Sequence, residues 1–146
     1  METNPSVSPE QIPSSYIRCF QGDCPKADSC ARLLAGKHLP EGQTTGPAVY
    51  PSARQGDSCA YYKPTRVIHA AYGFRALFAE VKKKDDTLLR NRIKAYLGGS
   101  SAYYRYHHGE RLLTPEQQEQ ITAFFRQRGY TDELRFDGYR DVYDFI

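Results

Sequence analysis

The stretch GGSSAYYRYHHGERLLTPEQQEQITAFFRQRG, residues 98–129, constrains the fold more than any other part of the chain. A glycine pair opens it, one glycine interrupts it and another ends it, and glycine is the usual residue just past a helix. The Thr-Pro-Glu-Gln sequence at 114–117 matches a helix start with a capping box and proline at N1. These signals predict a short helix over 101–108 and a longer one between Thr114 and Gly129.

Apolar periodicity predicts further helices before this stretch. Phe74, Leu77, Phe78 and Val81 recur at helical spacing, and a second apolar stripe follows Asp85 or Asp86 as an N-cap and ends at the glycine pair. The aromatic C-terminal segment LRFDGYRDVYDFI fits a strand or a last short helix equally well. The expected fold is therefore mainly α, a small helical bundle of the helix-turn-helix kind with an irregular cysteine-rich N-terminal half.

The first half of the chain has a different character. Residues 1–15 are rich in Pro and Ser without an apolar pattern, and we expect a flexible tail. Residues 16–62 are rich in Cys, Gly and Pro, with one short helix expected over 28–35. We expect this cysteine-rich segment and the helical segment 63–146 to form one compact unit.

Composition excludes several classes of protein. Apolar residues make up 40% of the chain and charged residues 25%, which is typical of globular proteins. No run approaches the roughly 18 apolar residues of a membrane span, and the N-terminus lacks the basic and apolar regions of a signal peptide. We therefore expect a cytoplasmic protein with no membrane partner.

The four cysteines are the main candidates for metal binding. Cys19, Cys24, Cys30 and Cys59 supply the four thiolates of a structural zinc site, and they lie where periodic burial is weakest. Their spacing lacks the usual C-x2-C pair, and an iron–sulfur cluster is the alternative cofactor. Unbridged thiols and disulfides also remain open. A structural zinc ion that replaces the missing core of residues 16–62 is the expectation.

The run YYRYHH at 103–108 surrounds its helix completely, because successive residues turn by about 100°. Tyr103 and Tyr106 share a face with Ala102, and we expect them to point inward. Tyr104 and His108 are four residues apart and are expected to face solvent, together with the arginine between them.

Charge is unevenly distributed along the chain. The whole sequence carries a net charge of +3, but residues 63–111 alone hold 11 Lys and Arg against 4 Asp and Glu. Such a local excess of positive charge favours binding to a polyanion.

The segment LGGSSAYYRYHHGERLLTPEQQEQITAFFRQRGY, residues 97–130, resembles the DNA-binding headpiece of the lactose-repressor family. The family pattern is matched at the positions Arg105, Gly109, Leu113, Thr114, Ile121 and Gly129-Tyr130. This chain differs in a shorter turn at the first glycines, in His108 where the family has asparagine, and in tyrosines at 103 and 104. The resemblance implies a helix-turn-helix in which the 101–108 helix contacts duplex DNA.

The whole chain is also similar to an uncharacterised family of gut-bacterial proteins, a domain of unknown function. That family shares the cysteine-rich start and a segment of the type YYRYHHGERLLTPEQQ. This resemblance implies one conserved unit and brings no activity with it.

We therefore expect a small DNA-binding protein, an accessory transcriptional regulator with a structural metal site. Lys and Arg bind phosphates, whereas hydroxyl and imidazole groups reach phosphates or base edges. The expected contact residues are Ser100, Ser101, Tyr104, Arg105, His108, Arg111, Arg90 and Lys94. A protein–protein interaction module with an exposed Tyr/Arg patch, or an iron–sulfur or redox protein, are the alternatives. No P-loop, GxGxxG, GxSxG or HExxH motif is present, and we expect no enzyme.

Overall fold

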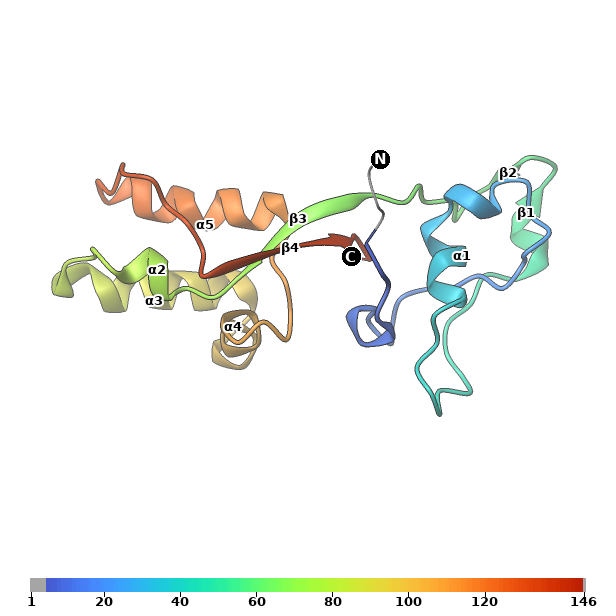
Figure 1. Cartoon of the computed structure of the whole chain (residues 1–146), viewed down its shortest axis with the longest axis horizontal. Helices are drawn as coiled ribbons and strands as arrows, with labels where there is room; N and C mark the ends of the chain where they lie inside the picture. The colour runs from blue at the N-terminus through green and yellow to red at the C-terminus, as the bar shows by residue number, and fades with distance from the viewer. Residues whose placement is uncertain (1–4, 146) are drawn as a thin grey trace. The chain divides into compact units, whose positions relative to one another are not determined.

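The computed structural model describes residues 5–145 of the chain, drawn in Figure 1. The described residues form two compact units, 5–67 with 142–145 and 68–141. The first unit holds short elements: the 3-10 helices η1 (Pro9–Gln11), η2 (Ala27–Ser29) and η3 (Pro51–Ala53), the helix α1 (Ala31–Gly36), and the strands β1 (Arg54–Gln55) and β2 (Ser58–Cys59). The second unit holds the helices α2 (Arg75–Phe78), α3 (Lys83–Leu97), α4 (Ser100–His107) and α5 (Pro115–Gln127).

The expectation of a mainly helical bundle is wrong, because the fold is mixed α/β. Two antiparallel two-stranded sheets accompany the helices, β1 with β2 and β3 (Val67–Tyr72) with β4 (Gly138–Tyr143). The backbone bonds from Asp144 N–H to Arg66 O and from Asp137 N–H to Gly73 O close the longer ladder at its two ends, at 2.8 and 3.2 Å. Its two strands are about 65 residues apart in the sequence, so local periodicity gave no sign of their pairing. The aromatic C-terminal segment, whose sequence fits a strand or a helix, forms β4.

One small apolar cluster and a buried arginine help to organise the first unit. Ile12, Tyr16, Ala35 and Phe145 pack together, and Ile12 is only 4% exposed. We expected a flexible tail over residues 1–15, but η1 and the buried Ile12 lie within this range. Residues 1–4 lie outside the described residues. Arg18 is buried beside α1 and donates to the Ala35 carbonyl oxygen at 2.6 Å.

The second unit has a larger apolar core. Its buried members come from β3 and from all four helices: Ala71 of β3, Leu77 of α2, Leu89 and Ile93 of α3, Tyr103 of α4, and Ile121 and Phe125 of α5. The Ala71 and Leu113 backbones exchange two hydrogen bonds, which tie the segment before α5 to β3. Burial of this many large side chains stabilises the unit, because each contributes about 1.5–3 kcal/mol.

The expected stripe at residues 74–81 gives a much shorter helix, α2. Gly73 has a φ of +83°, and a Cβ there would collide with the Asp137 side chain. Asp137 instead accepts hydrogen bonds from the Arg75 and Ala76 N–H groups at 3.1 and 2.7 Å, and so caps the first turn of α2.

Neither expected N-cap begins α3. The helix starts after Lys82, and Asp85 lies inside its first turn, where it is 3% exposed. Arg128 and the Tyr130 hydroxyl donate to its carboxylate at 2.7 and 2.6 Å, and these bonds hold the Asp85 pKa below its ordinary value. The residue therefore links the start of α3 to the end of α5.

The predicted helix pair beyond the glycines is present. Gly98 and Gly99 have φ values of +100° and +125°, which favour glycine, and the chain turns there from α3 into α4. Thr114 then caps α5: its hydroxyl accepts from Gln117 N–H, and the Gln117 side chain accepts from Thr114 N–H. These local signals placed both helices to within about a residue.

Candidate functional site

The α4 helix divides into a buried and an exposed face, as its sequence predicted. Tyr103 and Tyr106 are 1% and 7% exposed, whereas Tyr104 is 47% exposed. Ser101, Tyr104, Arg105 and His108 follow one another at i, i+3, i+4 and i+7 and are all exposed. They therefore line one solvent-facing stripe of the helix.

The neighbouring helix adds a cation to this stripe. The Lys94 ammonium of α3 lies 5.6 Å from the centre of the Tyr104 ring, and the Tyr104 and His108 rings stack at 6.2 Å. Lys94, Tyr104 and His108 are thus adjacent on the surface. We call this group the α4 surface; its members are Lys94, Ser100, Ser101, Tyr104, Arg105 and His108.

Arg90, another expected DNA-contact residue, makes its side-chain contacts within the protein. It binds Asp86 at 3.0 Å, donates to the Tyr103 hydroxyl at 3.2 Å and covers the Phe78 ring. Arg90 therefore neutralises an acid and satisfies a buried tyrosine. Burial raises the pKa of Tyr103, so its hydroxyl stays protonated while it accepts this bond.

Arg111 is exposed but also packs against α4. It is exposed, and its guanidinium lies over the ring of Tyr106 at 5.4 Å from the centroid. Its backbone N–H donates to the Arg105 carbonyl oxygen at 3.2 Å, in the turn that follows α4. Arg111 therefore lies at the C-terminal end of α4, whereas Ser100 and Ser101 lie at its beginning.

The two histidines of the run have different surroundings. His107 is half-buried, stacks with Phe74, and its Nδ1 accepts a hydrogen bond from Phe74 N–H at 3.1 Å. This bond needs an unprotonated Nδ1, and burial followed by the neighbouring His108 lowers the His107 pKa. His107 is therefore a structural residue that the sequence did not single out, whereas His108 belongs to the exposed stripe.

The sequence around the α4 surface carries an excess of positive charge, of which Arg90 is neutralised by Asp86. From Thr87 to Gly109 there are four Lys and Arg residues and no Asp or Glu. Arg92, one of the four, lies over the Phe124 ring of α5. Lys94 and Arg105 are the two cations of this stretch that belong to the α4 surface.

The four cysteines gather in the first unit. Cys19, Cys24, Cys30 and Cys59 all line one cavity, although they come from a loop, a turn, the start of α1 and the end of β2. All four are partly buried free thiols. In residues 5–145, no group of three or more His, Cys, Asp or Glu side chains is arranged to hold a metal ion.

Charged and apolar side chains complete this cysteine cavity. Lys26, Arg32 and Arg54 contribute positive charge, and Asp57 is the acid among the lining residues. Leu33 and Val49 form an apolar part of the wall. Arg54 binds Asp23 at 3.3 Å, and its hydrogen bond to Cys24 is the largest effect that raises its pKa. The sequence gave no local signal for these residues, because only the tertiary fold brings them to the thiols.

A comparison with protein families decides the classification of the chain. The model of a family of unknown function, DUF6078, matches residues 1–145. The chain belongs to this family. No curated protein and no solved structure matches it. The similarity to an uncharacterised family is thus confirmed, whereas the resemblance of residues 97–130 to a repressor headpiece stays a prediction.

The described helices bear on membrane association as well. None of the helices within residues 5–145 combines the length and the apolar character needed to cross a membrane.

Proposed function

We propose that this DUF6078 protein binds the phosphate backbone of duplex DNA through the α4 surface. The observation that carries the proposal is the exposed stripe Ser101, Tyr104, Arg105 and His108, with Lys94 beside it and no acid between Thr87 and Gly109. This is a cluster of cations and hydrogen-bond donors on one helix and its neighbour.

Each group on this surface has a chemical use at a phosphate. Arg105 and Lys94 supply charge, Arg105 with a planar fork that suits phosphate oxygens. The hydroxyls of Ser101 and Tyr104 donate to phosphate oxygens or to base edges. His108 can donate a ring N–H to a phosphate oxygen.

The beginning of α4 also suits an anion. Gly99 is its N-cap and makes no side-chain hydrogen bond, so the cap does not use the amides of the first turn. Ser100 and Ser101 are exposed there. The positive end of the helix dipole adds to the charge of Lys94 and Arg105 on the same surface.

The number of cations predicts weak, salt-sensitive binding. If two phosphates are neutralised, log Kobs falls with log salt with a slope of about −2, since each contributes about −0.9. Because the slope is negative, binding is strongest in dilute buffer. Sequence specificity would come from the few side chains that reach base edges.

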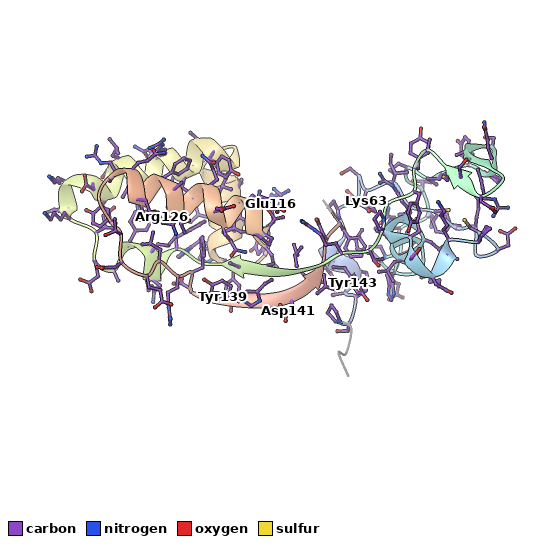
Figure 2. The ribbon with its side chains drawn as sticks, turned by 90° about the horizontal axis from the view of Figure 1, so that it is seen from above. Lys63, Glu116, Arg126, Tyr139, Asp141 and Tyr143 are labelled. Carbon is purple, nitrogen blue, oxygen red and sulfur yellow. The ribbon has the colours of Figure 1, made fainter. Side chains whose placement is uncertain are left out.

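The test is a titration of the full chain into labelled random duplex at several salt concentrations. Arg105→Ala should weaken binding and reduce the slope by about 1. Arg126→Ala is the matched control, because Arg126 is also exposed but lies on α5 (Figure 2). Equal effects of the two substitutions, or no binding in dilute buffer, would contradict the proposal.

A second candidate function is binding to another protein through α3. Leu88 and Tyr96 are large apolar side chains that remain 48% and 42% exposed on this helix. Aromatic and apolar anchors of this kind dominate many protein interfaces. A partner retained after nuclease treatment and lost with Leu88→Ser would favour this function over DNA binding.

A further inference from the structure

The cysteine cavity carries an inference independent of DNA binding. Its four thiols are separated by up to 40 positions in the sequence, yet all of them line one cavity in the first unit. We infer that the cavity binds an iron–sulfur cluster, which Cys19, Cys24, Cys30 and Cys59 ligate as thiolates. Four cysteine ligands are the usual set for both 2Fe–2S and 4Fe–4S clusters.

The four thiols favour a cluster over a single zinc ion, because they line a common cavity but, within the described part of the chain, form no group that could hold one metal ion. A Zn–S distance of about 2.3 Å would bring the four sulfurs of a tetrahedral site within about 3.8 Å of one another. Such a site is closed around one point and leaves no cavity between its ligands. Here the cysteines stand around a cavity whose wall also includes Leu33, Val49 and Tyr61. A cluster has a body of its own and fills a space of this kind.

The charges around the cavity match a cluster bound to four thiolates, which is an anion. Lys26, Arg32 and Arg54 lie in its lining, against Asp57. Arg32 is held in place by the Tyr61 carbonyl oxygen, to which its Nε donates at 3.1 Å. Lys26 lies over the Tyr62 ring, 4.5 Å from its centre. Without this positive charge, four thiolates in one partly buried cavity would repel one another strongly.

Arg54 provides an independent indication of a ligand at this place. Its Nη2 binds Asp23, but its Nη1 is buried and has no hydrogen-bond partner. A buried N–H without an acceptor costs about 1–3 kcal/mol. The side chain lines the same cavity as Cys24. Sulfur atoms of a bound cluster would supply the missing acceptor for Nη1.

Binding needs no oxidant or reductant when the cluster arrives assembled. Each cysteine thiol loses its proton as its sulfur forms a bond to one iron, and the ligand that the iron held before leaves with that proton. The exchange leaves the oxidation states of iron and sulfide unchanged. The apolar wall of Leu33 and Val49 then shields the cluster from solvent.

The first test is the composition of the full chain purified without oxygen. We expect iron and acid-labile sulfide in equal amounts, with about two or four irons per chain, and the broad visible absorption of thiolate-bound clusters. If the isolated chain contains no metal, ligand exchange with a synthetic thiolate-capped 4Fe–4S cluster should load it. Zinc without sulfide, or failure of both isolation and exchange, would overturn the inference.

Two variants separate ligation from folding. Cys24→Ser should lose most of the bound iron and sulfide, although it differs from the native chain only in replacing one ligand sulfur by oxygen. Arg54→Gln keeps all four ligands and should retain the cluster, but its reduction potential should become more negative, because a positive charge beside the cluster is lost. Arg66→Gln is the control, since Arg66 is outside the lining of the cavity. An unchanged potential in Arg54→Gln, or full cluster content in Cys24→Ser, would contradict the assignment.

Discussion

At the scale of single residues, neighbouring side chains of the same type have unrelated roles. Tyr103 and Tyr104 are adjacent, yet the first is buried against Phe74 and the second is exposed beside Lys94. His107 and His108 differ in the same way. The helical turn of about 100° explains the division of the tyrosines, and it was predictable from the sequence. The bond from Phe74 to His107 was not, because it joins residues 33 positions apart.

His107 makes the stability of its unit depend on pH. Its pKa is lowered in the folded state, so the unfolded chain binds more protons once the pH falls below about 6.5, the ordinary histidine value. We therefore expect stability to decrease from about pH 6.5 downward until His107 is protonated in the folded state too. His107→Gln should remove this contribution to the pH dependence.

Thermal unfolding across this pH range, with NMR titration of the histidine rings, would check the prediction. His108→Gln is the control, because His108 is exposed and makes no bond to Phe74. The prediction would fail if the ring of His107 titrated above the ordinary histidine value.

At the scale of elements, local signals gave most of the helices, missed β3 and left β4 undecided between strand and helix. α4 and α5 were predictable because glycines and a capping box act on neighbouring residues. β3 and β4 were not, because a strand depends on a partner that the local sequence does not contain. The start of α3 was also misplaced, because Asp85 serves Arg128 and Tyr130 instead of its own helix end.

The α5 capping box should contribute measurably to stability. Thr114→Ala removes the hydroxyl that accepts from Gln117 N–H and should lower the free energy of unfolding by about 1 kcal/mol. Thr131→Ala is the matched control: Thr131 is exposed and lies beyond α5, so its loss should cost less than about 0.5 kcal/mol. Urea unfolding of the three proteins measures both values. Equal costs would show that the cap contributes nothing beyond a generic threonine.

At the scale of the whole molecule, the two compact units carry different chemistry. Residues 68–141 hold 13 Lys and Arg against 10 Asp and Glu, whereas the remaining residues hold 7 of each. The positive unit contains the α4 surface, and the neutral one contains the cysteine cavity. The sequence suggested both candidate sites, from a run of aromatic and basic residues and from four thiols. It did not reveal that Arg90 is used internally, nor that Arg54 lies beside Cys24, because both follow from tertiary contacts.

The most direct test of the proposed function is to map duplex binding residue by residue. Backbone amide resonances of the labelled full chain would be followed by NMR as random duplex is added in dilute buffer. The account predicts that the largest shifts fall on residues 100–108 and on Lys94, while the exposed face of α5 around Arg126 changes little. Shifts confined to other parts of the chain, or none at all, would contradict DNA binding through the α4 surface.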